Sequence, residues 1–324
     1  MSNKTAFFCK VCGTEHFKWQ GQCKSCKEWN TLVEENIINE EKNKWTYDDK
    51  NRSNKSIKLE KIKSDDEPRI ISNDTEFNRV MGGGIVQGSL TLLGGEPGIG
   101  KSTLLLQITL KSDLKSLYIS GEESLRQIKL RATRISETRN NCYILSETRI
   151  NNLFNEIKEL KPEIVIIDSI QTLKSNYLDS PAGTISQIRQ VTTELTEYAK
   201  QTNTPVILVG HITKDGQIAG PKVLEHMVDT VLNFEGDKDH MYRILRSQKN
   251  RFGTTEEIGI YEMDSGGIHP IANPNKLLVD LEDNNLSGQA ISVAMKGVRP
   301  ILLEIQALVS SAVYGTPQRS STGF

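Results

Sequence analysis

The chain has 324 residues, of which 36% are hydrophobic and 25% are charged, and its formal net charge is −1. This length allows two or three domains, and the composition is that of a globular protein with enough apolar residues to bury a core. A net charge near zero gives no global basic field, so any contact with nucleic acid must come from local patches. No run of 18 apolar residues and no signal-like N-terminus occurs, which predicts no membrane segment and a cytoplasmic location.

Four of the five cysteines fall in the first 26 residues and form two Cys-x-x-Cys pairs. The pairs are Cys9 with Cys12 and Cys23 with Cys26, ten residues apart. Two such pairs supply four thiolates for one tetrahedral Zn²⁺; a disulfide pair or an iron–sulfur centre is the alternative. Four thiolates leave no open coordination position, so the ion is expected to stabilise the fold rather than catalyse.

Residues 1–33 are therefore predicted to be a zinc module. His16 is expected to be a surface or packing residue rather than a fifth ligand, and the lone Cys142 a small buried hydrophobe at the start of a strand. The module is expected to have a small aromatic core: Phe8, Phe17, Trp19 and Trp29. Residues 34–67, rich in Glu, Lys, Asn and Asp, predict a solvated linker with a short extended stretch at 56–62.

From residue 68 to 273, strand-length apolar runs alternate with amphipathic helical segments. This order predicts an α/β domain with a mainly parallel sheet and helices on both faces. The predicted strands are Ser89–Leu93, Ser116–Ile119, Ile164–Asp168, Pro205–Val209, Thr230–Phe234, Tyr242–Arg246 and Ile258–Glu262. The predicted helices are Lys101–Leu110, Ile150–Leu160, Ile185–Tyr198 and one that begins at Ser120, which has capping-box spacing to Glu123.

A glycine-rich loop separates the first of these strands from the first helix. Residues 95–102 read Gly-Glu-Pro-Gly-Ile-Gly-Lys-Ser and satisfy the P-loop pattern. Glycines let successive backbone N–H groups turn towards phosphates, and the following helix presents its positive N-terminal end to them. The alternative is a glycine-rich turn that only starts a helix. We therefore predict an ATP-binding and ATP-hydrolysing site, with these nucleotide-binding residues: Gly95, Glu96, Pro97, Gly98, Ile99, Gly100, Lys101, Ser102 and Thr103.

Carboxylates stand at the ends of two other predicted strands. Asp168 is expected to hold Mg²⁺ together with the Ser102 hydroxyl, although it could also cap a helix. Glu122 is favoured as the base that activates the attacking water, with Glu123 as the cap of the next helix. The alternative is that both glutamates only cap that helix.

Residues 274–324 predict a β-hairpin with a turn at Gly297–Pro300. Ile291, Val293 and Met295 alternate with small or polar residues, and a second alternating run starts at Ile301, so one apolar face is expected. Since a lone hairpin is marginally stable in water, we interpret this region as the start of a further domain that is incomplete here. The alternative is a tail that packs onto the preceding α/β domain.

Six features follow one another in an order that resembles a known family. The four-cysteine module and the loop at 95–102 come first. Four motifs come next: Tyr118-Ile-Ser-Gly-Glu-Glu-Ser124, Val165-Ile-Ile-Asp-Ser169, Val209-Gly-His-Ile-Thr-Lys-Asp-Gly216 and Lys249-Asn-Arg-Phe-Gly253. Over essentially its whole length, the chain resembles the bacterial RadA (Sms) family of RecA-like DNA repair and recombination ATPases. Lys-Asn-Arg-Phe-Gly is the most family-specific of these motifs.

The resemblance implies a homo-hexameric ring around single-stranded and branched DNA, with recombinase or replicative helicase partners. ATP would lie between subunits, so that Lys249 and Arg251 approach a neighbour's nucleotide. His211 matches the position of a γ-phosphate sensor, and segments 174–183 and 214–221 match DNA-facing loops. Read from the residues alone, Lys249–Arg251 is a basic turn and His211 a strand-end histidine.

The resemblance also implies that residues 274–324 begin a Lon-protease-like α/β domain extending beyond Phe324, in a family not known for proteolysis. The predicted function is a DNA-dependent ATPase of recombinational repair that drives branch migration, with ATP, Mg²⁺ and Zn²⁺ as cofactors. The alternative is a RecA-like ATP-binding switch that binds DNA or partner proteins with little hydrolysis. A protease is disfavoured because no Ser–Lys dyad can be assigned.

Overall fold

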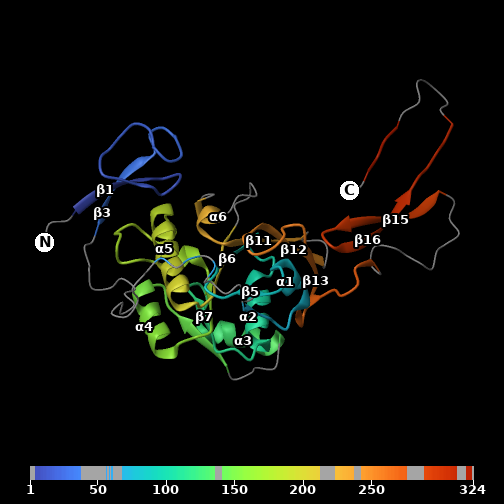
Figure 1. Ribbon diagram of the computed structural model, residues 1–324, viewed down its shortest axis with the longest axis horizontal. Helices are drawn as coiled ribbons and strands as arrows, with labels where there is room; N and C mark the ends of the chain where they lie inside the picture. The colour runs from blue at the N-terminus through green and yellow to red at the C-terminus, as the bar shows by residue number, and fades with distance from the viewer. Residues whose placement is uncertain are drawn as a thin grey trace. The chain divides into compact units, whose positions relative to one another are not determined.

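The computed structural model describes residues 4–37, 56, 58, 60, 68–135, 141–211, 223–236, 242–275, 288–311 and 319–322 (Figure 1). The chain divides into two compact units, Met1–Ile271 and Ala272–Phe324. Among the described residues, no helix has the length and apolar character needed to cross a bilayer.

A nine-stranded sheet organises the first unit, with the order β14-β13-β12-β11-β6-β10-β9-β7-β8 among the described residues. The strands from β11 to β8 in this order run parallel, and β12, β13 and β14 continue the sheet antiparallel. Their bounds are β6 (Leu90–Gly95), β7 (Ser116–Ser120), β8 (Cys142–Ser146), β9 (Ile164–Asp168), β10 (Val206–Val209), β11 (Thr230–Gly236), β12 (Tyr242–Asn250), β13 (Ile258–Asp264) and β14 (Gly267–Pro270).

Helices cover both faces of this sheet, because its central strands are apolar on both sides. In β9, Val165 and Ile167 join one buried cluster, and Ile164 and Ile166 join the other. Successive side chains of a strand point to opposite faces, so a continuous apolar run needs cover on each. One cluster includes residues of α4 (Ile150–Leu160), α5 (Ile185–Thr202) and α6 (Val223–Met227). The other includes residues of α1 (Thr75–Val80), α2 (Lys101–Lys111) and α3 (Leu125–Ile135).

The predicted order of strands and helices is confirmed, with one displaced helix start. Helix α3 begins at Leu125 and not at Ser120. Ser124 forms the capping contacts: its backbone N–H and its hydroxyl both donate to Gln127 Oε1, at 2.9 and 2.8 Å. Ser120 Oγ accepts from Glu123 N, at 3.0 Å, in the turn before the helix. The sequence therefore contains two successive capping patterns, and the later one starts the helix.

The four-cysteine module contains a three-stranded sheet, β2-β1-β3. Its strands are β1 (Lys4–Cys9), β2 (Glu15–His16) and β3 (Leu32–Ile37). Strand β3 continues four residues beyond the module boundary expected at residue 33. The extended stretch expected at 56–62 lies largely outside the described residues. A short antiparallel pair, β4 (Arg69–Ile70) with β5 (Ile85–Val86), precedes the main sheet.

The second unit contains a hairpin of β15 (Gln289–Lys296) and β16 (Arg299–Gln306). The hairpin was predicted, but its single apolar face is wrong. Lys296 pairs with Arg299, so odd-numbered residues of β15 pair with even-numbered residues of β16. Directly paired residues share a face, and Val293 pairs with Leu302 while Ala294 pairs with Ile301. The two-residue turn therefore places apolar side chains on both faces.

Candidate functional site

The glycine-rich loop connects the end of β6 to the start of α2. Gly98 and Gly100 have φ angles of 80° and 113°, in the left-handed region that favours glycine. Gly100 is the N-cap of α2 and, lacking a side chain, leaves the first turn without a capping bond. The first N–H groups of a helix have no intrahelical acceptor, so this end of α2 can receive an anion. The residues present therefore fit a bound phosphate chain.

Lys101 places a buried cation inside this loop. Its amine donates to Gly95 O at 2.7 Å and to Glu96 O at 2.9 Å, and the residue is 4% exposed. Burial lowers the pKa of Lys101 to about 8, against the attraction of Asp168 and Glu122. Because this ammonium is partly desolvated, its electrostatic attraction to a bound polyanion is stronger than it would be in water.

Asp168, at the end of β9, is held from the neighbouring strand β7. Tyr118 is fully buried, and its hydroxyl donates to Asp168 Oδ2 at 2.6 Å. Among the described residues, no other hydrogen bond reaches this carboxylate. Asp168 is 6% exposed and close enough to Lys101 to affect its pKa. The Asp168 carboxylate and the hydroxyl of Ser102, in the first turn of α2, are oxygen ligands of the kind that Mg²⁺ prefers.

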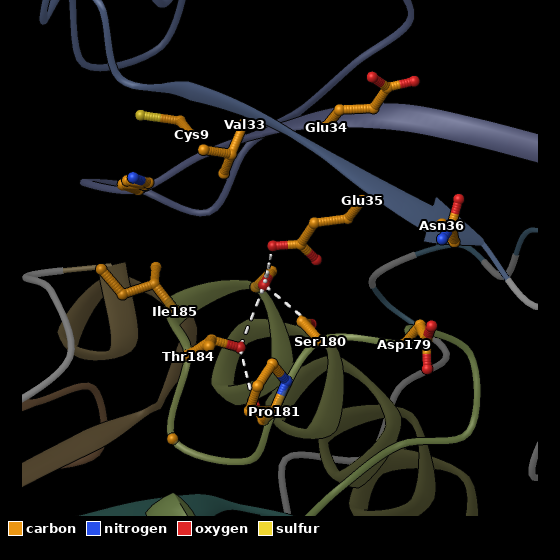
Figure 2. Close-up of a pocket in the computed structure, with 13 residues that line it drawn as sticks. Cys9, Val33, Glu34, Glu35, Asn36, Asp179, Ser180, Pro181, Thr184 and Ile185 are labelled. Atoms are coloured by element: carbon orange, nitrogen blue, oxygen red, sulfur yellow. Dashed lines mark hydrogen bonds between the residues drawn. The ribbon is translucent and has the colours of Figure 1, made fainter.

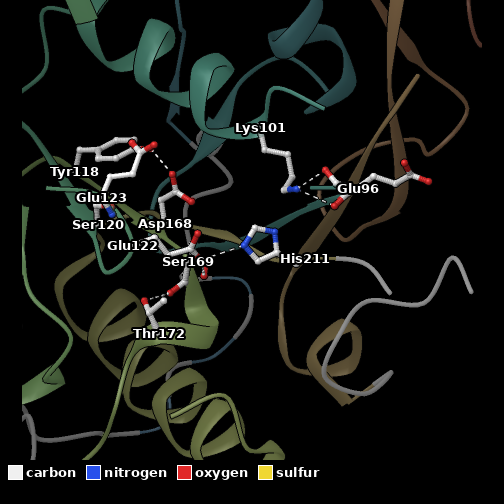
Figure 3. A network of polar contacts seen from close by, with 11 residues as sticks. Glu96, Lys101, Tyr118, Ser120, Glu122, Glu123, Asp168, Ser169, Thr172 and His211 are labelled. Carbon is white, nitrogen blue, oxygen red and sulfur yellow. Dashed lines mark hydrogen bonds and ion pairs between the residues drawn. The ribbon is translucent and has the colours of Figure 1, made fainter. Parts of the chain in front are cut away.

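Glu122 follows β7 and accepts two hydrogen bonds on one oxygen, Oε1 (Figure 3). Ser169 Oγ donates at 2.6 Å, and His211 Nε2 lies at 3.1 Å. Burial raises the pKa of Glu122, but the hydrogen bonds from Ser169 and His211 outweigh it, so the pKa is lowered overall. His211 Nδ1 is buried and has no partner among the described residues. The structure thus brings together Lys101, Asp168, Glu122 and His211.

Glu123 belongs to a different environment. Its carboxylate pairs with Arg131 of α3 and does not cap that helix. The two adjacent glutamates are therefore separated by their partners, because one contacts strand-end residues and the other contacts a helix.

Two residues of this cluster were missed from the sequence, Tyr118 and Ser169. Both lie inside motifs quoted for the family resemblance. The pairing of Ser120 with Asp168 aligns the ends of β7 and β9, so Ser169 and Glu122 both lie just beyond that edge. Only the cross-strand register reveals this neighbourhood, since the two residues are 47 positions apart.

Lys249 and Arg251 lie at the opposite end of the sheet from the loop of their own chain. Thr230 of β11 pairs with both Asn250 and Thr91, whereas Phe234 pairs with Gly95. Four residues of strand span about 13 Å. These basic residues therefore do not join the cluster around Lys101 within one chain.

The contacts of the two basic residues differ. The Lys249 amine donates to the carbonyls of Glu225 and Val228, both at 2.7 Å, at the end of α6. Arg251 pairs with Asp229 Oδ1 at 2.9 Å, and its side chain remains 51% exposed. Lys249 is therefore engaged locally, whereas Arg251 is accessible.

The four predicted metal-ligand cysteines form a cluster. Their sulfur atoms lie within 4.8 Å of one another. Cys9 and Cys26 are 3.6 Å apart, and Cys12 and Cys23 are 3.5 Å apart. Tetrahedral Zn²⁺ with Zn–S bonds of about 2.3 Å needs sulfur separations of about 3.8 Å. The cluster fits one Zn²⁺. Cys142 lies apart from it, partly buried at the start of β8.

The predicted aromatic core of the module is wrong in three of its four members. Phe8 is buried, but Phe17, Trp19 and Trp29 are 89%, 59% and 66% exposed. The other buried hydrophobic side chains of the module are three of the cysteines and the apolar residues Ala6, Leu32 and Ile37. His16 is a buried packing residue, 3.4 Å from Cys23 Sγ. A metal cluster holds such a small fold together, so large aromatic residues are not needed inside it.

The module contacts the start of α5 and the segment before it. Arg189 donates to Cys12 O at 3.0 Å and to Thr14 Oγ1 at 2.9 Å. A cavity of about 580 Å³ lies beside this contact, where Ser186 donates to Glu35 at 2.8 Å (Figure 2).

The same contact covers part of the segment expected to face DNA, 174–183. Leu178 is 1% exposed and packs with Ala6, Phe8 and Ile37 of the module. The surface around Leu178 is therefore not free, because the zinc module occupies it. The second predicted DNA-facing segment, 214–221, lies outside the described residues.

Two family models match this chain, one over the ATPase core and one over the four-cysteine module. The family described as AAA domain matches residues 56–217, and the family described as rubredoxin metal binding domain matches residues 7–34. A KaiC-like protein from Pyrococcus horikoshii shares the fold, with a TM-score of 0.52 and 19% identity over 63% of this chain and 99% of that chain.

Relatives with higher identity carry one name. DNA repair protein RadA of Listeria monocytogenes is 46% identical over 322 residues, which cover 98% of this chain and 70% of the relative. DNA repair protein RadA of Bacillus subtilis is 46% identical over 325 residues, covering 99% and 71%. With this identity over nearly its whole length, and with a P-loop core and a four-cysteine module, the chain belongs to the RadA family of DNA repair proteins.

Proposed function

We propose that this protein is a DNA-dependent ATPase of recombinational repair, which drives branch migration as a homo-hexameric ring. Its substrates would be single-stranded and branched DNA in the cytoplasm, with recombinases or replicative helicases as partners. The observation that carries the proposal is the cluster of Lys101, Asp168, Glu122 and His211 beside the P-loop, in a member of a DNA repair family.

Each residue of the cluster has a role in the proposal. The backbone of residues 95–103 and the Lys101 amine bind the phosphates of ATP. Ser102 and Asp168 would hold Mg²⁺, which supplies electrostatic stabilisation of phosphate charge when bound. Glu122 accepts the proton of the attacking water, while Ser169 and His211 orient its carboxylate. The buried Nδ1 of His211, which has no hydrogen-bond partner in the part of the chain that the structure describes, supports a role in sensing the γ-phosphate.

Arg251 is proposed to serve the nucleotide of a neighbouring subunit. Its distance from the P-loop of its own chain and its 51% exposed side chain support this placement. A cation supplied by a neighbour stabilises transition-state charge and links hydrolysis to ring assembly. Lys249 donates to the carbonyls at the end of α6, and through these bonds it would position the turn that carries Arg251.

Measuring ATP turnover with and without single-stranded DNA tests the proposed function. A DNA-dependent ATPase shows turnover that rises when DNA is added. The alternative, an ATP-binding switch, binds ATP with little turnover in either condition. Turnover that DNA leaves unchanged would contradict the proposal.

Arg251→Ala is expected to bind ATP like wild type and to lose turnover by about 10³-fold, the lower range for an arginine supplied in trans. Steady-state hydrolysis and nucleotide binding are both measured. Arg246→Ala is the control, because Arg246 is also a partly exposed arginine paired with a carboxylate, that of Glu235. Arg246→Ala should retain turnover.

Mixing subunits tests the trans arrangement directly. Arg251→Ala subunits keep a complete P-loop, and Lys101→Ala subunits keep Arg251. Where one stands beside the other, a complete site forms, so the mixture should hydrolyse more ATP than either variant alone. A mixture that assembles without regaining turnover would argue against the shared site.

Cys23→Ser is expected to reduce bound zinc from one equivalent per chain to nearly none, because a structural site loses much of its affinity with one of four thiolates. DNA-dependent function should be lost while ATP binding remains. Metal analysis of the purified protein measures the zinc. Cys142→Ser, which changes a cysteine outside the cluster, should keep a full equivalent; the same content in Cys23→Ser would count against the four-thiolate site.

A further inference from the structure

Three large aromatic side chains of the zinc module point into solvent, and neither proposed site uses them. Phe17 and Trp19 lie between the two cysteine pairs, and Trp29 follows the second pair. Their exposed fractions are 89%, 59% and 66%. Burying such a side chain contributes about 2 kcal/mol to a fold, so these residues do not stabilise the module by burial.

The second cysteine pair lies in a tight hairpin that positions Trp29. Asn30 N donates to Gly21 O at 2.7 Å, and Cys23 N donates to Glu28 O at 2.9 Å. A Cβ atom on Gly21 would lie 3.4 Å from the Trp29 ring. The ring therefore lies over Gly21, two residues after Trp19, on a backbone held by the cysteine cluster.

The aromatic residues are also not part of the contact between the module and α5. That contact uses the carbonyl of Cys12, the Thr14 side chain and Glu35. The exposed fractions apply with the ATPase core in place. The aromatic side chains are thus available to another molecule.

The lysines of the zinc module indicate the chemical class of the molecule that binds there. Lys18, Lys24 and Lys27 lie between Phe17 and Trp29 along the chain and are exposed. Among the described residues, none of the three forms an ion pair. Exposed rings interleaved with lysines suit a flexible polyanion with planar groups, because bases stack on aromatic rings and lysines neutralise phosphates. Lysine is depleted at protein–protein interfaces, so a nucleic acid is favoured over a protein partner.

We propose that Phe17, Trp19 and Trp29 form a stacking surface for unpaired bases of single-stranded nucleic acid, with Lys18, Lys24 and Lys27 on the phosphates. We call these six residues the stacking surface. It is separate from the ATPase core and needs no nucleotide, so it goes beyond the proposed motor function. It would retain a single strand while the ring changes its state.

Tryptophan fluorescence of the whole chain measures binding to this surface. The chain has three tryptophans, and a Trp45→Phe background leaves Trp19 and Trp29 as reporters. Without ATP, oligo(dT) should quench the emission and bind at least about tenfold more tightly than an abasic strand of equal length. Equal affinity for both strands would overturn base stacking.

Substitutions assign the residues. The triple change Phe17→Ala, Trp19→Ala and Trp29→Ala should weaken oligo(dT) binding by at least about tenfold, measured by anisotropy of a labelled strand. A full zinc equivalent in this variant shows that the module is folded. Tyr143→Ala removes an exposed aromatic side chain from the ATPase core, outside the zinc module, and should bind like wild type. A folded triple variant with wild-type affinity would overturn the proposal.

The lysines have a separate readout. Changing Lys18, Lys24 and Lys27 to Gln should reduce the slope of log affinity against log salt by about 2, at about 0.7 per phosphate contact. An unchanged slope would overturn their role. The inference and the proposed function fail differently: loss of the stacking signal with DNA-stimulated turnover intact removes only the former. Base-dependent quenching without DNA-stimulated turnover removes only the latter.

Discussion

Lys101→Ala is expected to lower ATP turnover by at least about 10²- to 10³-fold, the cost of removing one preorganised group that stabilises transition-state charge. The Lys101 amine is the buried cation of the P-loop, held by Gly95 O and Glu96 O. Its loss removes this buried positive charge from the loop. A coupled phosphate-release assay measures turnover, and a fluorescent ATP analogue measures binding.

The dependence of ATP affinity on pH tests whether Lys101 acts through its charge or only through its place in the fold. Because the pKa of Lys101 is lowered to about 8, the free protein loses the charge as pH rises through 8. Bound phosphates favour the charged amine, so ATP affinity should be constant below pH about 8 and fall by up to tenfold per pH unit above it. Lys101→Ala should lack this decline. Lys129→Ala, on the exposed side of α3, should keep both turnover and profile; equal turnover in Lys101→Ala would refute the site.

Glu122→Gln is expected to lower turnover by about 10²- to 10⁴-fold while ATP still binds, because an amide cannot accept the proton of the attacking water. Glu123→Gln is the matched control, since Glu123 pairs with Arg131 of α3. Single-turnover hydrolysis measures the chemical step in both variants. Loss of the chemical step in Glu123→Gln, with Glu122→Gln active, would exchange the two roles.

The pKa of Glu122 also predicts how turnover depends on pH in the acidic range. Burial opposes ionisation, but hydrogen bonds from Ser169 and His211 leave the pKa below its usual value. Turnover should therefore persist as pH falls towards 4.5 and decline only below it. Ser169→Ala removes one of these bonds and should move the decline to higher pH. If turnover of Ser169→Ala declined at the same pH as wild type, Ser169 would not be lowering the pKa of Glu122.

Local patterns were sufficient for most of the strands and long helices of the ATPase core, but not for α1, α6 and β14. The P-loop, the strands of the parallel sheet and α2, α4 and α5 follow from apolar periodicity and glycine spacing, which depend on neighbours in the chain. The start of α3 was misplaced because Ser120 and Ser124 both begin capping patterns. Which of them caps depends on how β7 ends against β9, a contact with a distant strand.

In the zinc module, too, the sequence predicts some features and only the fold shows the others. Cysteine spacing predicts four ligands, since the tetrahedral geometry of the ion constrains positions along the chain. It carries no information on where Phe17, Trp19 and Trp29 point. An aromatic residue in a short sequence normally indicates a core, and only the fold shows that the cysteine cluster replaces that core.

The sequence by itself predicted the P-loop, the four-cysteine cluster and the carboxylates at strand ends, because each is a local pattern tied to one chemistry. Tertiary structure alone separated Glu122 from Glu123, added Tyr118 and Ser169 to the site, and covered Leu178 with the zinc module. It also placed Arg251 at the far end of the sheet from its own P-loop. These facts depend on strand register and packing between residues far apart in the chain, which no local pattern encodes.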